Sequence, residues 1–432
     1  MATYGSNGRR VAIVAGLRTP FTRAGTDLKP LTAQDLGRAV VAELLQRTAL
    51  EGKEIEALVF GTVVPSVLAP NIAREVALLP MLPKGIQSYT VSRACASANQ
   101  AITDAADQIV LGNLNTVIAG GAESLSNIPI LHSRRFSDVV LTASKARSAG
   151  ARIGALAQLR PRDLIPVTPA IAEPSTGETM GESAEKMAKL NHIPREEQDQ
   201  FALRSHRLAA AGTQDGRLGA EIMPLYVPPK YEVVATRDNG IRTETSLEQL
   251  QALKPVFDRR YGSVTAGNSS PLTDGAAAVL LMSGERAEAL GYKPLAYIRS
   301  YAYTALDPGE QLLQAPVLAA PVALRRAGLS LKDIDLVEMH EAFAAQVLSN
   351  LEGFESKTWA ARAGFTKPVG EVDRSRLNVM GGSIAIGHPF GATGARITTT
   401  LAHELGRRGG QFGLMTVCAA GGMGFAMVLE AA

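Results

Sequence analysis

Cysteine is scarce in this sequence: the 432 residues include only Cys95 and Cys418, which lie in opposite halves of the chain. So low a cysteine content excludes a small scaffold held together by disulfides, since such scaffolds are dense in cysteine. No secretory framework surrounds either residue, so we expect two reduced thiols in a cytosolic compartment. A single disulfide between them is the alternative.

Long apolar runs and an excess of charge are also missing. No stretch is long and apolar enough to span a membrane, and "MATYGSNGRRVAIVAG" reaches a strand-like run at Val11 without the apolar centre of a signal peptide. The 44 Lys and Arg residues nearly balance the 41 Asp and Glu residues, and the net charge of +3 gives the chain as a whole no case for nucleic-acid binding. We therefore expect a cytoplasmic protein.

Apolar residues and glycine are plentiful. The hydrophobic fraction is 46%, the charged fraction is 20% and there are 41 glycines, as in a globular α/β protein with many tight turns. Strand-like runs at 11–14 and 116–119 alternate with helical patterns such as 33–45, which predicts crossover units and a mainly parallel sheet. Because 432 residues are too many for one ordinary core, we expect two large domains or one fold built twice.

Two features favour one fold built twice. "KEIEALVF" (53–60) can be laid over "KDIDLVEM" (332–339), although any helix-to-strand junction can give so short a match. In each half, moreover, a strand, a reactive side chain, a helical pattern and a second strand follow in the same order: 89–92, Cys95, 98–109 and "TVIAGG", then "LNVMGG", His388, 397–405 and "GLMTVC". If the halves pack about a pseudo-twofold axis, Cys95 and His388 face each other across it.

The segment from about 127 to 261 differs from both halves. It is rich in proline, arginine and polar residues and poorer in alternating strands. Because long excursions in compact domains are usually functional or disordered, we interpret it as an insertion that covers a site as a lid.

Cys95 lies in "VSRACASANQ", where an amphipathic pattern begins. Ser97 and Gln100 have the spacing of a capping box, so the helix is predicted to start within a residue or two of Cys95. The positive end of the helix dipole and a nearby histidine would raise the thiolate fraction of a cysteine whose pKa is ordinarily about 8.5. The alternative is that Cys95 is a small buried residue.

His388 and Cys418 both lie in glycine-rich turns. "GGSIAIGHPFGATGAR" carries five glycines from Gly381 to Gly394, and Pro389, placed at the first helical turn, holds His388 extended so that its ring projects. Cys418 ends an apolar strand and enters "CAAGGMG", whose amides could bind a developing oxyanion. A structural hydrogen bond for His388 and a core position for Cys418 are the alternatives.

Several other chemistries can be excluded. "MHEAFAA" starts like a zinc-protease helix, but Ala344 occupies the position of the second histidine ligand. The sequence has no nucleophile-elbow serine, no phosphate-binding loop with lysine and no dinucleotide-binding fingerprint. Acyl chemistry on cysteine remains.

Taken together, five segments resemble the thiolase family in the expected order, from about Val11 to Glu430. They are "SRACASANQA", "GSVTAGNSSPLTDGAAA", "HEAFA", "GGSIAIGHPFGATGAR" and "CAAGGMG". The resemblance implies an α/β fold of two duplicated βαβ-type halves in a five-layered α-β-α-β-α arrangement with an inserted loop domain. We place the N-terminal half, with its insertion, at 9–285 and the C-terminal half at 290–431.

The resemblance also implies roles for single residues. Cys95 would be the nucleophile that becomes acylated, and Cys418 the acid and base at the α-carbon of acetyl-CoA. His388 would activate Cys95 and help to hold the thioester oxyanion. The amides of Cys95 and Ala420 would form a second oxyanion hole. The remaining matches are a pantetheine contact at Ser270 and cavity-lining residues at Met180 and Phe343.

Two positions depart from the family pattern. His340 replaces the asparagine that holds a water in an oxyanion hole, so it could hold that water or enter the hole itself. Ala420 replaces the first glycine expected after the neighbour of the second cysteine. The histidine form resembles the β subunits of fatty-acid oxidation trifunctional complexes and their bacterial 3-ketoacyl-CoA thiolase relatives, as do "STGETMGESAE" and "RDLIPVTPAIAE".

The function implied is thiolytic cleavage of 3-ketoacyl-CoA by CoA in fatty-acid β-oxidation. A biosynthetic acetoacetyl-CoA thiolase and a non-catalytic acyl-CoA-binding scaffold subunit are the alternatives. Coenzyme A is the substrate, and we expect no other cofactor and no metal. The expected partners are a second copy of the chain, in a homodimer or larger assembly, and an α subunit carrying hydratase and dehydrogenase activities.

One stretch concentrates basic charge. Residues 131–162 carry seven Lys and Arg residues against Asp138 alone, interleaved with apolar residues as in an amphipathic surface element. The stretch is either a solvated face that assists with coenzyme A phosphates or a docking surface for an anionic membrane or the α subunit.

Overall fold

The computed structural model describes residues 8–167 and 172–432. The described residues form two compact units, one from Ile128–Ala172 and the other from Met1–Asn127 together with Glu173–Ala432. None of their helices combines the length and the apolar character that a membrane span requires.

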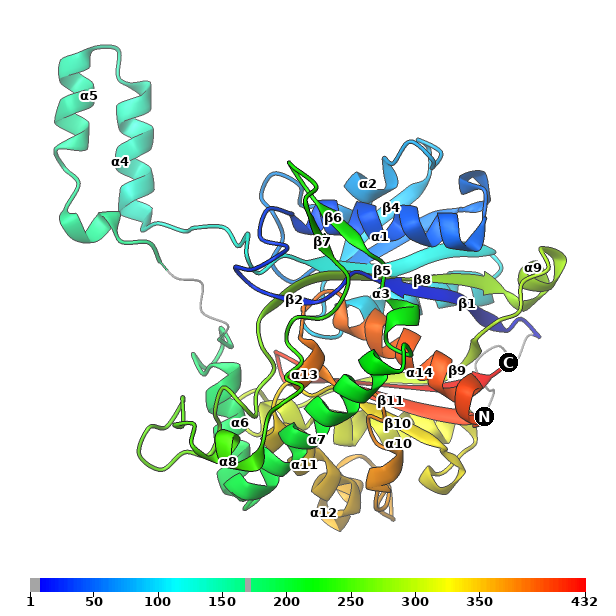
Figure 1. The fold of residues 1–432 in the computed structure, drawn as a ribbon. Helices are drawn as coiled ribbons and strands as arrows, with labels where there is room; N and C mark the ends of the chain where they lie inside the picture. Colours follow the sequence, from blue (N-terminus) through cyan, green and yellow to red (C-terminus); the bar gives the residue numbers. More distant parts are fainter. Residues whose placement is uncertain (1–7, 168–171) are drawn as a thin grey trace. The chain divides into compact units, whose positions relative to one another are not determined.

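A ten-stranded mixed sheet organises the large unit (Figure 1). Its strands run in the spatial order β10-β11-β12-β9-β1-β8-β5-β3-β4, and β2 adds to β8. The bounds are β1 Val11–Arg18, β2 Thr22–Arg23, β3 Ala57–Gly61, β4 Gln87–Val91, β5 Thr116–Glu123, β8 Thr273–Ser283, β9 Ala296–Ala305, β10 Leu336–Met339, β11 Phe412–Ala419 and β12 Met423–Ala431. β3, β4 and β5 are parallel to one another, as are β10 and β11, while β8, β1, β9 and β12 pair antiparallel.

The sheet consists of two halves with the same order of strands. β3, β5, β8 and β1 on one side correspond to β10, β11, β12 and β9 on the other, and β1 meets β9 at the centre through Val11–Ile298, Ala12–Tyr297 and Ile13–Ala296. The two segments aligned in the sequence are equivalent, because a short 3₁₀ helix precedes β3 (Gly52–Glu54) and another precedes β10 (Leu331–Asp333). The duplication is thus confirmed.

"LNVMGG" does not form the expected strand. Leu377 makes only an isolated parallel bridge to Val337, and Val379 bridges Gly381. Asn378 explains the interruption: its φ of 44° breaks the extended backbone, and its side chain bonds Met339 through both N–H and C=O. The segment occupies the place of β4 without continuing as a strand.

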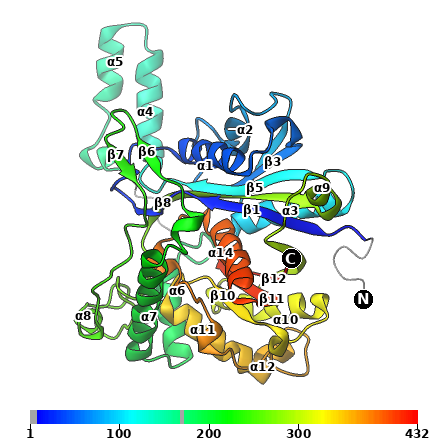
Figure 2. The same cartoon turned by 45° about the vertical axis from the view of Figure 1, so that its right-hand side comes forward.

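Two helices of the large unit lie between the halves of the sheet, and Figure 2 shows α14 in this central position. The central pair is α3 (Ser97–Val110) and α14 (Thr393–Arg408). α1 (Ala33–Thr48) and α2 (Ile72–Ala77) cover the first half, and α10 (Pro316–Ala327), α11 (Ala344–Glu355) and α12 (Lys357–Arg362) cover the second. The five-layered fold is confirmed.

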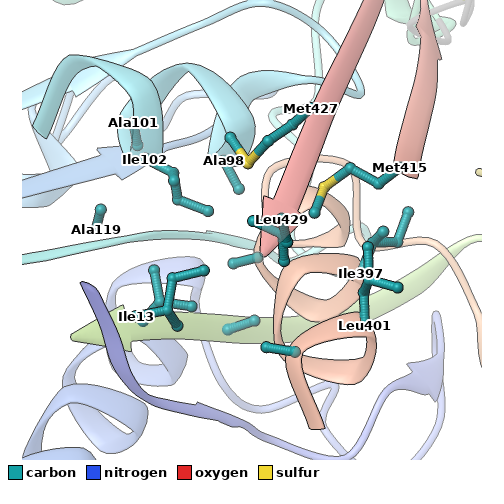
Figure 3. Packing of buried hydrophobic residues seen from close by; sticks show 14 of the residues in the cluster. Ile13, Ala98, Ala101, Ile102, Ala119, Ile397, Leu401, Met415, Met427 and Leu429 are labelled. Carbon is teal, nitrogen blue, oxygen red and sulfur yellow. The ribbon is translucent and has the colours of Figure 1, made fainter. Parts of the chain in front are cut away.

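Side-chain alternation on the strands contributes to the three large apolar cores of the described residues, beside which lies one small cluster around Leu306. Ile13 points to the central layer, while its neighbours Ala12 and Val14 pack with α1 and α2 in the outer core. Figure 3 shows the central core, to which Ile102 of α3 contributes from one side and Ile397 and Leu401 of α14 from the other. Burial on both faces accounts for the nearly continuous apolar runs of these strands.

Much of the expected insertion packs into the large unit. It contributes α6 (Met180–Leu190), α7 (Arg195–Gln214), α8 (Leu247–Gln251) and a small hairpin of β6 (Leu225–Val227) and β7 (Val233–Ala235); α9 (Gly284–Ala289) follows β8. Arg18 of β1 anchors it, donating two bonds to Asp238 at 2.6 and 2.9 Å and one to Glu221 at 2.9 Å. All three side chains are fully buried, so these bonds fix the insertion to the central sheet.

The small unit is a helical pair. α4 (Arg134–Lys145) and α5 (Ala149–Leu156) are capped by Ser133 and Ser148. Arg135 forms an ion pair with Asp163 at 3.3 Å and bonds the carbonyl of Gln158. The part of the expected insertion that forms a separate unit is therefore this basic segment alone.

Candidate active site

Cys95 lies in a tight turn between β4 and α3. Ala94, just before it, has a φ of 44°, which is unusual for a residue other than glycine. Ser97 holds the turn, because its hydroxyl donates to Ala94 O at 2.6 Å and accepts from Arg93 N at 2.8 Å. The expected capping box is therefore wrong, although the helix starts where predicted: the N-cap is Ala96, which makes no side-chain cap bond.

His388 reaches this turn from the other half of the chain. Its Nε2 lies 3.2 Å from Cys95 Sγ and its Nδ1 lies 2.6 Å from Thr393 Oγ1. The Thr393 hydroxyl donates to Pro389 O, so it accepts from His388 Nδ1, and Nε2 is left to accept the thiol hydrogen. The predicted meeting of Cys95 and His388 is confirmed, whereas Pro389 lies before the helix, since α14 starts at Thr393.

The approach of the two halves depends on close backbone contact and on one buried carboxylate. A Cβ on Gly391 would lie 2.7 Å from Gly61 O and 2.8 Å from Ala122 O. Glu123, at the end of β5, accepts bonds from the amides of Val63, Val64 and Gly391. Sequence reasoning missed Glu123, because a single glutamate after a strand carries no signal of its later partners.

The Cys95 thiol is protonated in this environment. Burial raises the pKa of Cys95 to about 12, although hydrogen bonds from the amides of Ala420 and Cys95 act in the opposite direction. Burial, and then Arg396, lower the pKa of His388 to about 3, so its imidazole is neutral. The expectation of a raised thiolate fraction is wrong, because the loss of solvation outweighs the helix start.

This pair makes a pH prediction. Because the pKa of Cys95 is raised to about 12, its thiolate fraction should increase about tenfold per pH unit between about pH 7 and pH 9. We expect the second-order rate of Cys95 alkylation by iodoacetamide to rise by the same factor, measured in a Cys418→Ala variant so that one thiol reacts. A rate that stays flat over this range would indicate a preformed thiolate–imidazolium pair instead.

Cys418 and the turn after it complete the site. Cys418 lies one residue before the end of β11 and is 1% exposed. Burial, followed by the neighbouring Cys95 sulfur, raises its pKa well above the ordinary value. In the turn, the residues with positive φ are Gly421 (82°) and Gly422 (67°), so an alanine at position 420 needs no unusual backbone. Glu173, buried, accepts from Gly421 N at 2.7 Å and fixes the turn.

His340 follows β10 and is fully buried beside His388, with ring centroids 4.2 Å apart. Its Nδ1 lies 3.0 Å from Ser383 Oγ, and its Nε2 has no hydrogen-bond partner among the residues that the structure describes. Burial, then His388 and Arg396, lower its pKa well below the ordinary value, so this ring is neutral as well.

Of the remaining predicted residues, Met180 and Phe343 pack against the apolar core that contains Cys418, and Ser270 lies shortly before β8. Phe343, the N-cap of α11, contacts Phe257 edge to face at 6.2 Å, and Met180 packs against the same core. Ser270 donates its amide to Ala342 O, and its neighbour Ser269 forms a bridge with Phe343. The structure thus brings Ser270 and Phe343 together on adjacent segments.

Among the residues that the structure describes, Cys95, His340 and His388 form a group that could hold a metal. The Cys95 sulfur and one ring nitrogen of each histidine lie within 4.8 Å of one another, a donor set suited to zinc. The thiol and the His388 ring are hydrogen-bonded to each other. The absence of a metal from the working enzyme stays a prediction.

A thiol, a neutral base, converging amides and a second buried thiol, on a duplicated α/β fold, define an enzyme of covalent acyl transfer. Family models for the thiolase N-terminal domain and the thiolase C-terminal domain match residues 11–285 and 292–431. The chain belongs to the thiolase family.

Similarity to known proteins extends over nearly the full length of the chain. The chain is 51% identical to a 3-ketoacyl-CoA thiolase of Shewanella pealeana over 426 residues, 98% of each protein, and 51% identical to that of Klebsiella pneumoniae, covering 98% of this chain and 97% of the relative. Among solved structures, human mitochondrial 3-ketoacyl-CoA thiolase in complex with CoA has a TM-score of 0.82 at 32% identity, covering 100% of this chain and 99% of that one. Bacillus anthracis acetyl-CoA acetyltransferase has a TM-score of 0.84 at 35% identity, covering 98% and 99%.

Proposed function

We propose that this chain cleaves 3-ketoacyl-CoA with CoA, giving acetyl-CoA and a shortened acyl-CoA, in fatty-acid β-oxidation. The observation that carries the proposal is the 3.2 Å contact between Cys95 Sγ and His388 Nε2, which pairs a nucleophile with a neutral base. The names of the relatives at 51% identity support the same reaction.

In the first half-reaction, Cys95 Sγ attacks the C3 ketone carbon as its hydrogen passes to His388 Nε2. The amides of Cys95 and Ala420, which both donate toward the sulfur, hold the resulting oxyanion. The C2–C3 bond then breaks, its electron pair forms the enolate of acetyl-CoA, and the Cys418 thiol donates a hydrogen to C2. His388 and His340 hold the enolate oxygen.

In the second half-reaction, the sulfur of CoA attacks the acyl group on Cys95 and gives its hydrogen to the Cys418 thiolate that the first half-reaction left. The Cys95 sulfur leaves and takes back its hydrogen from His388 Nε2, and the shortened acyl-CoA is released. Ser270 is assigned to the pantetheine arm, and Met180 and Phe343 to the walls of the cavity. No step requires a cofactor besides the CoA substrate.

The test is a series of 3-ketoacyl-CoA substrates of increasing chain length, each assayed with CoA for acetyl-CoA release. We expect turnover of several lengths. Turnover of acetoacetyl-CoA alone would favour the biosynthetic alternative. A non-catalytic scaffold would show neither turnover nor an acyl adduct on Cys95 by mass spectrometry after mixing with acyl-CoA.

The domain division at 9–285 and 290–431 and a cytoplasmic location are part of this proposal. Two free cysteines in the described residues support a reducing compartment. Two features support a homodimer. Strand β4 lies at one end of the sheet and offers a free edge to a second copy. Val67 and Leu68, nearby in sequence, are 85% and 94% exposed and offer an apolar tip.

We assign the small unit to docking on an anionic surface, whether membrane or α subunit. Besides its basic residues, it exposes a set of large apolar side chains: Ile130, Leu131, Val140, Leu141, Ile153, Leu156, Leu164, Ile165 and Val167. Apolar area beside positive charge is the composition of elements that lie on anionic lipid, where each basic residue contributes about 1 kcal/mol.

For this unit, we expect Arg134→Gln, Lys145→Gln and Arg147→Gln together to weaken binding to phosphatidylserine vesicles about a hundredfold at low salt, with turnover of short substrates unchanged. Arg135 is left in place because it pairs with Asp163. A matched control removes three exposed lysines elsewhere, Lys29, Lys230 and Lys332. Unchanged vesicle binding with a raised KM for CoA would assign the charges to the substrate instead.

A further inference from the structure

The two neutral histidines of the site need opposite tautomers if both act in the proposed reaction. His388 must accept a hydrogen at Nε2, so it carries its own on Nδ1, where Thr393 accepts it. His340 must instead donate from Nε2 to the enolate oxygen, so its Nδ1 must accept a hydrogen bond. An imidazole does not choose between these forms by itself, because the hydrogen bond at the other nitrogen decides.

Ser383 supplies that bond from the start of α13 (Ser383–Ile386). Its hydroxyl lies 3.0 Å from His340 Nδ1 and accepts from Arg396 Nη2 at 3.0 Å, and these are its two partners among the described residues. A serine hydroxyl has one hydrogen to donate. If His340 Nδ1 also donated to Ser383 Oγ, the hydrogen of the Ser383 hydroxyl would have no acceptor, although the side chain is fully buried. His340 Nε2 would then face the reacting atoms with a lone pair.

Arg396 fixes the direction of the hydrogen bonds that run from it through Ser383 to His340. An arginine can only donate, so Ser383 must accept from it and pass its own hydrogen onward. The guanidinium is 1% exposed on α14 and is held near Glu338 of β10, with Nη1 3.8 Å from Oε2. Ser383 therefore lies between a fixed donor and a nitrogen that must accept.

We propose that Ser383, oriented by Arg396, is a positioning residue that donates to His340 Nδ1 and so fixes His340 in the tautomer with its hydrogen on Nε2, pointing at the reacting atoms. This inference rests on the proposed function for the identity of the oxygen that Nε2 meets. The tautomer itself does not depend on turnover. Sequence alone gave no hint of it, because the serine is separated from His340 by 43 positions.

The test is a double-mutant cycle on thiolysis. Ser383→Ala should lower kcat about tenfold to a hundredfold with KM nearly unchanged, because the oxyanion donor is lost and binding is not. In a His340→Ala background, itself expected to lose about ten- to a thousandfold, the same change should cost less than about twofold. Ser349→Ala is the matched control. It removes a different buried hydroxyl which, unlike that of Ser383, has no hydrogen-bond partner among the described residues.

A second readout separates this inference from the proposed function. ¹⁵N NMR of the histidine rings should show His340 with its hydrogen on Nε2 in the unmodified protein and a mixture of tautomers in Ser383→Ala. An equal loss of kcat in both backgrounds, or an Nδ1–H tautomer in the unmodified protein, would overturn the inference. Absence of thiolysis in the unmodified protein would instead overturn the proposed function, and the NMR result would still decide the role of Ser383.

Discussion

A Cys95→Ser protein should fold normally and lose thiolysis by several orders of magnitude. Serine keeps the size and the hydrogen bond to His388 Nε2 but replaces the thiol by an alcohol, which is a far weaker nucleophile at neutral pH. His388 takes a hydrogen from an alcohol less readily than from a thiol, because the alcohol is the weaker acid. Steady-state release of acetyl-CoA measures the loss.

Thermal unfolding provides the control, since the substitution changes one atom in a well-packed turn and should leave the midpoint close to that of the unmodified protein. An acyl adduct should also be missing from the variant after incubation with acyl-CoA. Turnover within tenfold of the unmodified protein would show that Cys95 is not the nucleophile.

Cys418→Ser should separate the two proposed proton transfers. Acylation of Cys95 by a plain acyl-CoA requires no chemistry at the α-carbon, so the adduct should still form at a rate within about tenfold. Exchange of the α-hydrogens of acetyl-CoA with deuterated water is the step assigned to Cys418, and we expect it to fall by about three orders of magnitude. The high pKa of this buried thiol makes it an acid that keeps its hydrogen until the enolate forms.

The exchange reaction is followed by mass spectrometry of acetyl-CoA, with Cys95→Ser measured alongside. Exchange that persists in Cys418→Ser would assign the α-carbon chemistry to another group. Loss of both acylation and exchange, with the fold intact, would show that Cys418 is needed to shape the site rather than to transfer the hydrogen.

Local patterns were sufficient to predict the duplication of the fold and the meeting of Cys95 and His388, whereas the five-layered arrangement came from the family resemblance. The repeated order of strand, reactive residue and helix placed Cys95 and His388 face to face, and the structure confirms this at 3.2 Å. The helical patterns at 98–109 and 397–405 became the central helices α3 and α14. These features succeed because they are carried by residues close together in the chain.

Features that depend on tertiary partners could not be predicted. Burial raises the pKa of Cys95, but burial is a property of the assembled halves rather than of the turn. Ser97 has capping-box spacing, yet its hydroxyl donates to Ala94 O and accepts from Arg93 N in the turn before the helix. Spacing alone does not show which of these partners the hydroxyl takes. Glu123 and Ser383 acquire their roles only from residues far away in the chain.

Because the chain is made from its N-terminus, the two halves of the site are synthesised at different times. Cys95 leaves the ribosome well before His388, which follows 293 positions later. Until the second half docks, the first half is a thiol-bearing fragment that lacks its base, the second thiol and the amide of Ala420. With the roles proposed for these residues, an incomplete chain cannot cleave 3-ketoacyl-CoA, and activity begins only when synthesis and folding are both complete.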